Sequence, residues 1–270
     1  MPRLSITHLG VASQDAGGLS RGGILGQASA ETLAYITAVE TADGQGLEPA
    51  VLAALVSFAN WRIPLGGACC ILAGARTLAG ALVPLVGPAP TGVNLVAGDY
   101  SRTLGLAGNG TNKTVATGYF NNSMAQNSRH LAINLSVYSY TSAGNTYFGS
   151  SIRNTGDTLI FDQVLGNMQY RCSTNTNSAV AGYGRDGFNA VNRLASGSFT
   201  RHSQVDLSTA TEASVTPANT DELYLYSRLG TGNFAAGTIN LYSAGPGVAD
   251  MVDFQARVAN LMSALAAALP

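Results

Sequence analysis

The chain has 270 residues, which is enough for one large β domain or for a small domain followed by a larger one. Charged residues make up 11% of it, the net charge is −1 and Lys113 is the single lysine, so the composition excludes the strongly basic surface that binds nucleic acid or anionic membranes. Uncharged Ser, Thr, Asn and Gly supply most polar positions. They favour protein–protein contacts or neutral ligands such as sugars, because they cost less free energy to desolvate than ions.

Residues 1–28 are rich in glycine and have no apolar period, which predicts an extended arm that becomes ordered only against a partner. No apolar run of the length of a secretory signal occurs near the start, so we expect none. The most apolar stretch, 64–86, is interrupted by Arg76 and by prolines at both ends. It is a poor candidate for membrane insertion.

Residues 29–92 are predicted to form a helical hairpin and an apolar linker. Ser29 is a suitable N-cap for the first helix, and Gly44 ends it. Pro49 suits the first turn of a second helix, which carries an apolar side. The segment 61–90 is apolar but full of glycine and proline, which favours a linker packed on the domain surface or against another subunit.

From residue 93 onward the apolar period changes to two. One stretch alternates apolar with small or polar residues, as a half-buried strand does: Leu131, Ile133, Leu135 and Val137. Further short strands are predicted between turn residues at 146–153, 157–164, 168–173, 196–203, 205–209, 222–228 and 238–243. The stretch 247–269 returns to helical spacing. We therefore predict that residues 93–270 form a mainly β, antiparallel jelly-roll sandwich with a C-terminal helix, able to fold without the arm.

Residues 94–120, NLVAGDYSRTLGLAGNGTNKTVATGYF, predict the opening hairpin of this domain. They also resemble the start of the concanavalin-A-like (laminin-G-like) jelly-roll domain of tailed-bacteriophage structural proteins, where a G-x-x-G-x-G-T/S-x-K run follows a D-Y-x-R-x-x-G segment. The matching positions are Asp99, Tyr100, Arg102, Gly105, Gly108, Gly110, Thr111 and Lys113. The strand ending LYSAGPG and the terminal helix ending LMSALAAAL resemble the other end of that domain.

The resemblance implies a virion structural protein that is assembled in the bacterial host cytoplasm. An arm and an apolar linker suit an anchored appendage, so we favour the tail, fibre or baseplate, with other virion proteins as partners of the arm and a host-surface glycan as an optional ligand. Capsid decoration (cement) is the structural alternative, and a free glycan-binding module or glycan-degrading enzyme is the alternative of another class. The apolar span 64–90 indicates a homo-oligomer, with a trimer favoured for a fibre.

The carboxylate pattern of a jelly-roll glycosidase is missing. The sequence lacks the Glu-x-Asp-x-Glu triplet with which these enzymes place carboxylates on one strand face. Structural or turn roles are expected for the histidines, His8, His130 and His202. We therefore predict no enzyme activity, no cofactor and no metal site, while calcium at a loop rim is left open because aspartates lie near predicted loops: Asp157, Asp186 and Asp206.

Sugar binding would combine aromatic rings with neutral amides. Side chains of both kinds lie in or beside the predicted loops, and the predicted ligand is a neutral or weakly charged glycan. The predicted ligand-binding residues are Tyr138, Tyr140, Asn145, Tyr147, Tyr183 and Asn189. The alternative for each tyrosine is an ordinary strand aromatic with its hydroxyl at the surface.

Overall fold

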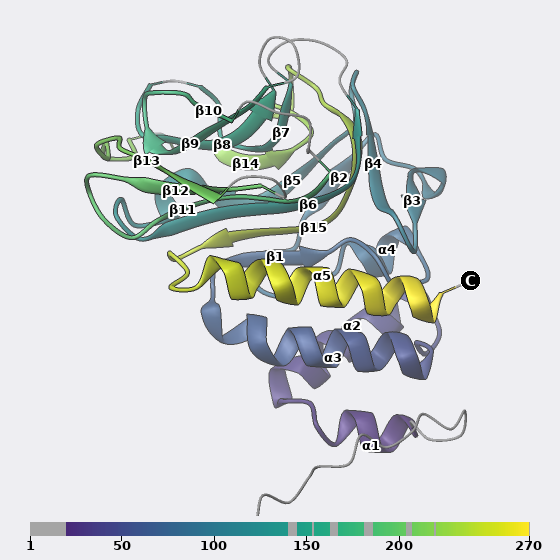
Figure 1. Ribbon diagram of the computed structural model, residues 1–270. Coiled ribbons are helices and arrows are strands. Elements are labelled where there is room, and N and C mark those ends of the chain that lie inside the picture. The colour runs from purple at the N-terminus through teal and green to yellow at the C-terminus, as the bar shows by residue number, and fades with distance from the viewer. Residues whose placement is uncertain are drawn as a thin grey trace, which may run out of the picture.

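Most of the described chain forms two antiparallel β-sheets that lie face to face (Figure 1). The structure is a computed structural model that describes residues 20–139, 145–152, 154–162, 167–180, 186–203, 207–218 and 220–269. Sheet A has the order β13 (Leu207–Ala210), β12 (Phe199–His202), β11 (Gly187–Arg193), β6 (Arg129–Ser139), β15 (Ala236–Gly245), β4 (Gly105–Asn109) and β3 (Tyr100–Ser101), with β1 (Ala68–Ile71) also beside β15. Sheet B has the order β10 (Ser178–Val180), β9 (Met168–Thr174), β8 (Asp157–Asp162), β7 (Thr146–Gly149), β14 (Glu222–Leu225), β5 (Thr114–Phe120) and β2 (Thr91–Val93).

The space between the sheets is filled by apolar side chains that alternate along the strands with outward residues. Leu131, Ile133 and Leu135 point inward from β6, and Phe148 and Ile160 belong to the same core from sheet B. The predicted antiparallel sandwich is therefore confirmed.

The alternation along β6 changes at Ser136. Its neighbours Leu135 and Val137 pair with consecutive residues of β15, so Ser136 has no partner there. Such a bulge reverses the faces of the residues that follow. Val137, predicted to continue the buried row, is 41% exposed, whereas Tyr138 packs against the sandwich core.

A layer of helices covers the outer face of sheet A, on the side away from sheet B (Figure 1). Ser29 caps α2 by accepting a hydrogen bond from Thr32 N at 3.1 Å, and Gly44, with φ +72°, ends it. The helices are α1 (Arg21–Leu25), α2 (Ala30–Asp43), α3 (Pro49–Arg62), α4 (Leu78–Ala81) and α5 (Met251–Ala268), with the 3₁₀ turns η1 (Ile63–Leu65), η2 (Ala97–Asp99) and η3 (Asn121–Ser123). No helix in the described ranges is long and apolar enough to cross a membrane.

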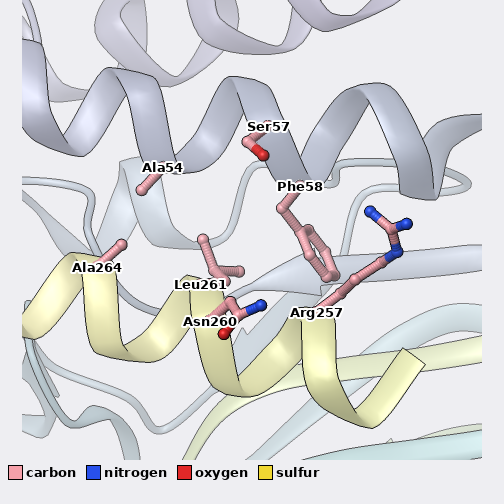
Figure 2. A pocket seen from close by; sticks show the side chains of 7 residues that line it. All are labelled: Ala54, Ser57, Phe58, Arg257, Asn260, Leu261 and Ala264. Atoms are coloured by element: carbon pink, nitrogen blue, oxygen red, sulfur yellow. The ribbon is translucent and has the colours of Figure 1, made fainter. Parts of the chain in front are cut away.

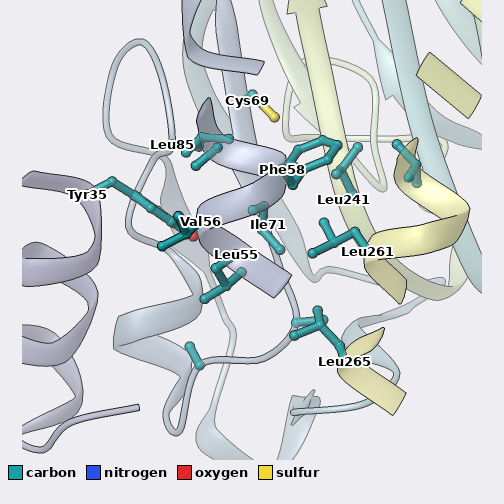
Figure 3. Close-up of a cluster of buried hydrophobic side chains, with 14 of the residues drawn as sticks. Tyr35, Leu55, Val56, Phe58, Cys69, Ile71, Leu85, Leu241, Leu261 and Leu265 are labelled. Atoms are coloured by element: carbon teal, nitrogen blue, oxygen red, sulfur yellow. The ribbon is translucent and has the colours of Figure 1, made fainter. Parts of the chain in front are cut away.

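The helices and sheet A enclose a second apolar core (Figure 3). Phe254 of α5 is fully buried, and its ring centroid lies 5.0 Å from that of Trp61 and 5.4 Å from that of Phe188. Other members of this core are Tyr35, Leu55, Val56, Phe58, Cys69, Ile71, Leu85, Leu241, Leu261 and Leu265. The helical layer therefore seals this side of sheet A.

The segment 61–90, predicted to be a linker, supplies a strand to sheet A. All four residues of β1 are buried, and β1 pairs with β15 beyond the stretch that pairs with β4. Gly67 permits this approach, because its φ is +79° and a Cβ there would lie 2.1 Å from the carbonyl oxygen of Ala244. The linker prediction is wrong for residues 68–71, because a strand buried on both faces is apolar throughout and shows no period of two. The helical segment and the sandwich thus share sheet A.

Part of the predicted extended arm is helical. Ser20 caps α1, which buries Ile24, and Arg21 Nη1 donates to Glu40 Oε1 at 2.7 Å. The extended-arm prediction is therefore wrong for residues 21–25, and residues 1–19 lie outside the described residues.

Two of the residues that carry the family resemblance join the helical segment to the sandwich. Arg102 donates from Nη1 and Nη2 to the Glu48 carboxylate at 3.0 and 2.7 Å, and from Nε to the carbonyl oxygen of Ala75 at 3.0 Å. The Tyr100 hydroxyl donates to the same carbonyl at 2.7 Å. These motif positions therefore have structural roles in this fold.

Candidate functional site

The outer face of sheet B carries a cluster of polar side chains around one aromatic ring. Met168, Tyr170 and Cys172 of β9 point into the core, so the residues between them, including Arg171, point outward. The outer-face cluster consists of Asn154, Asp157, Phe161, Arg171, Asn177 and Arg228. None of the described helices covers this face (Figure 1).

Arg171 is held in one orientation. Its Nη1 donates to Asp157 Oδ2 at 2.7 Å and to Asn154 Oδ1 at 3.0 Å, and its Nε donates to Asn177 Oδ1 at 2.6 Å. The side chains of Arg171 and Asp157 are only 7% and 0% exposed. Charges buried to this extent require pairing and hydrogen bonds, and both are present here.

Arg228 adds a second guanidinium group to the cluster. Its Cζ lies 5.5 Å from the centroid of the Phe161 ring, and its Nε donates to Thr146 Oγ1 at 3.0 Å. Burial and then the positive charge of Arg171 lower the pKa of Arg228, whereas Asp157 raises it. The cluster thus holds two guanidinium groups and one carboxylate.

One row of sheet B leads from Arg171 to an aromatic ring. Arg171 pairs with Leu159, Leu159 with Gly149, and Gly149 with Tyr224. Gly149 cannot carry a side chain without displacement, because its φ is +145° and a Cβ would lie 2.3 Å from the Cβ of Leu159. Two positions, Leu159 and Gly149, therefore lie between Arg171 and the half-buried Tyr224, and the one next to Tyr224 has no side chain.

The predicted ligand-binding tyrosines lie elsewhere, at one end of the sandwich interior. The ring centroids of Tyr138 and Tyr147 are 5.8 Å apart. The Tyr138 hydroxyl donates to Asp162 Oδ2, and the Tyr147 hydroxyl donates to the carbonyl oxygen of Ser139 at 2.9 Å. Tyr147 is fully buried, so its ring packs within the protein.

The two predicted asparagines are buried as well. The carbonyl oxygen of Asn145 accepts a hydrogen bond from Asp162 N at 2.7 Å. Asn189 lies on β11, where its Oδ1 accepts from the Tyr170 hydroxyl at 3.0 Å. Tyr140 and Tyr183 lie outside the described residues. A ligand role for these six residues stays a prediction.

A second polar network lies beneath the helices, on the outer face of sheet A. Arg62 donates from Nε and Nη2 to Ser243 Oγ at 3.2 and 2.9 Å, and the same hydroxyl lies 2.6 Å from His130 Nε2. His130 Nδ1 lies 2.6 Å from the carbonyl oxygen of Pro246. Burial, and to a smaller extent the charge of Arg62, lowers the pKa of His130 to about 3. His130 is therefore neutral and structural in this network, called the buried network below.

Other features add no chemical site. In the part of the chain that the structure describes, no three His, Cys, Asp or Glu side chains are placed to hold a metal ion. Figure 2 shows a hollow of about 220 Å³ between α3 and α5, lined by Ala54, Ser57, Phe58, Arg257, Asn260, Leu261 and Ala264. It is smaller than typical ligand pockets of roughly 300–1,000 Å³. Arg257 at its edge pairs with Asp253 and lies over the Trp61 ring.

No family model and no curated protein matches the sequence. Part of the chain is similar to the solved CBM40 domain of Ruminococcus gnavus IT-sialidase bound to α2,3-sialyllactose, at 14% identity and a TM-score of 0.37, covering 49% of this chain and 82% of that one. Domain 4 of AbnA, a GH43 extracellular arabinanase from Geobacillus stearothermophilus in complex with arabinotriose, is 9% identical with a TM-score of 0.35, covering 66% and 82%. The NanB sialidase from Streptococcus pneumoniae is 13% identical with a TM-score of 0.38, covering 54% and 26%. At these TM-scores the fold assignment rests on the strand pairing above, and the bound sugars are those proteins' ligands.

The ligand residues predicted from the sequence include no member of the outer-face cluster. The sequence does indicate that Arg171 lies on an outer strand face, because the predicted strand 168–173 alternates apolar residues with Gln169, Arg171 and Ser173. Arg228 had no such signal, since only the strand pairing brings it to Phe161.

Proposed function

We propose that this chain is a non-enzymatic glycan-binding protein whose ligand lies on the outer face of sheet B. The observation that carries the proposal is the set of accessible groups on this face, which has no described helix above it: Asn154 is exposed, and Asn177, Arg228 and Tyr224 are half-buried. The Phe161 ring is only 1% exposed and serves to support Arg228. Planar guanidinium and amide groups hydrogen-bond sugar hydroxyls, and aromatic rings cover the apolar face of a sugar ring.

The non-enzymatic part is supported by the carboxylate content of the cluster. Glycosidases place two carboxyl groups about 5–10 Å apart around the scissile bond. The cluster contains one carboxylate, Asp157, and its Oδ2 already accepts from Arg171 and from Asn154 N. A steady release of reducing ends from any bound glycan would contradict this part of the proposal.

A virion role, whether in the tail, fibre, baseplate or capsid decoration, stays a prediction. It rests on the sequence resemblance, and two of the residues behind it, Tyr100 and Arg102, make contacts that stabilise the fold in any setting. A glycan-binding face is compatible with a virion protein and with a free module. Immuno-electron microscopy of purified phage particles distinguishes the two.

The test is a glycan array with the full-length protein, followed by calorimetry on the strongest ligand. We expect Arg228→Gln to weaken binding at least about tenfold, because a hydrogen bond from a charged group contributes about 1.5–3 kcal/mol. The matched control is Arg257→Gln on α5, which removes an equal charge from the helical layer and should change the affinity less than twofold. An array without any signal, or equal losses in the two variants, would overturn the proposal.

A further inference from the structure

The outer face of sheet B carries a second group of accessible side chains, where β14 pairs with β5. Phe120 of β5 is 43% exposed, and it is the one aromatic residue among the exposed large hydrophobic side chains of the described chain. It pairs with Glu222 of β14, so the two side chains lie on the same face with their Cβ atoms about 5 Å apart. Leu223 points into the sandwich core, so Glu222 and Tyr224 on either side of it point outward.

The half-buried Glu222 carboxylate has no cation beside it. Its Oε1 accepts a hydrogen bond from Gly118 N, which fixes its position. No arginine, lysine or histidine within the described ranges forms an ion pair with it. An ionised carboxylate has about four acceptor sites, so one backbone hydrogen bond leaves capacity for donors from outside the protein. Hydroxyl groups are suitable donors, because they hydrogen-bond a carboxylate without requiring a positive charge.

Tyr224 forms the other side of this group. Burial and then the negative charge of Glu222 raise the pKa of Tyr224, so the two side chains lie close together and the hydroxyl stays protonated. The loop after β14 holds the ring in place: a Cβ at Gly230 would lie 3.0 Å from Tyr224 Cε1. Phe120, Glu222 and Tyr224 thus provide an exposed ring, a fixed acceptor and a hydroxyl within one short stretch of the face.

This group lies beside the outer-face cluster on the same face. Tyr224 is three strands away from Arg171 along the row of paired residues described above. Neighbouring strands are about 4.8 Å apart, so the two strands are separated by roughly 14 Å. An oligosaccharide can span that distance, whereas a single sugar ring cannot.

We propose that Phe120, Glu222 and Tyr224 form a subsite for a neutral sugar unit of the glycan bound by this face. The apolar side of the sugar ring stacks on Phe120, and its hydroxyl groups donate to Glu222. An acidic unit is disfavoured, because its carboxylate would face that of Glu222 without a cation between them. This inference rests on the proposed function and adds the class of sugar that binds at this end of the face.

The first experiment tests the stacking on Phe120. Calorimetry with the full-length protein and the strongest ligand from the array compares Phe120→Ala with Leu104→Ala, which removes a similarly exposed apolar side chain just before β4 of sheet A. We expect Phe120→Ala to weaken binding about fivefold or more, and Leu104→Ala to weaken it less than about twofold.

The second experiment tests the discrimination by charge. The same ligand is compared with a form in which its primary alcohols have been oxidised to carboxylates, and we expect the oxidised form to bind about fivefold or more weakly. Glu222→Gln keeps an acceptor for Gly118 N but removes the charge, so the difference between the two forms should shrink. The matched control is Asp253→Asn on α5, which removes an equal charge from the helical layer and should leave the difference unchanged.

The results separate this inference from the proposed function. Unchanged affinity in Phe120→Ala, or the same discrimination in Glu222→Gln as in the wild type, would overturn the subsite. The proposed function would stand in that case if Arg228→Gln still weakened binding. A glycan array without any signal would overturn both.

Discussion

The molecule holds arginine-centred polar groups on the outer faces of both sheets, and the two sites differ in what covers them. On sheet A, the buried network of Arg62, His130 and Ser243 lies under α3 and α5, with the Phe254 ring edge-on to His130 at 5.9 Å. On sheet B, the outer-face cluster combines similar groups without a described helix above it (Figure 1).

The partners of the arginines differ accordingly. Arg62 donates only to uncharged oxygens, those of Ser243, Gly66 and Ala68, which join α3 and β1 to β15. Arg171 instead pairs with the carboxylate of Asp157, and the charge of Asp157 also acts on Arg228. A buried polar group that joins two layers makes its hydrogen bonds within the protein, whereas a ligand-binding group must also be able to bond to a ligand. The helices that cover one site, and not the residue types, separate the two roles.

The largest effect on stability is expected when the helices that cover sheet A are removed. A fragment of residues 93–270 lacks α2, α3 and β1, so Phe254 and the rest of the inner face of α5 lose the side chains against which they pack. We expect this fragment to show no cooperative thermal transition by circular dichroism, whereas residues 20–270 unfold in one transition. A cooperative 93–270 fragment would support the separate β domain predicted from the sequence.

A single substitution at Gly67 should weaken the pairing of β1 with β15, which joins the helical segment to sheet A. Gly67→Ala places a Cβ against the Ala244 backbone at a positive φ, so we expect it to lower the free energy of unfolding by about 3–4 kcal/mol. Gly66→Ala is the control, since its φ is also positive but no atom lies within 4 Å of the added carbon. Gly66→Ala should lower the free energy of unfolding by about 1–2 kcal/mol, measured by urea titration. Equal decreases in the two variants would show that β1 does not pack closely against β15 at Gly67.

A smaller, pH-dependent effect is expected from the buried network. His130 stays neutral in the folded protein because burial lowers its pKa to about 3, but it takes up a proton near pH 6.5 once unfolded. Its contribution to stability is therefore complete above pH 6.5 and is lost as the pH falls toward 3. The stability of the wild type should fall with decreasing pH more steeply than that of His130→Gln, by up to about 1.4 kcal/mol per pH unit. Parallel curves between pH 6.5 and 4.5 would contradict a buried neutral His130.

Much of the fold could be predicted from local patterns. Ser29, Gly44 and Pro49 mark the helix ends of α2 and α3, and the period of two identified β6 up to Leu135. β1 was missed because its side chains are buried on both faces, so neither period appears. The bulge at Ser136 was missed because it depends on the register with β15.

The candidate site was less accessible to sequence reasoning. Arg171 and Asp157 are 14 residues apart, and they meet only because β8 and β9 pair in a particular register. Tyr147 and Asn189 have the right chemistry for a sugar, but strand pairing turns them into the interior. Residue type therefore suggested a ligand class, while the location required the sheets.

The most direct test of the account is where a saccharide contacts the protein. Backbone amide chemical shifts of the ¹⁵N-labelled full-length chain can be followed during titration with the strongest ligand from the array. We predict that the largest changes occur in β7, β8, β9 and β14 and at Arg228, with α3 and α5 unchanged. Changes concentrated in α3 and α5 would contradict the assignment of sheet B as the ligand-binding face.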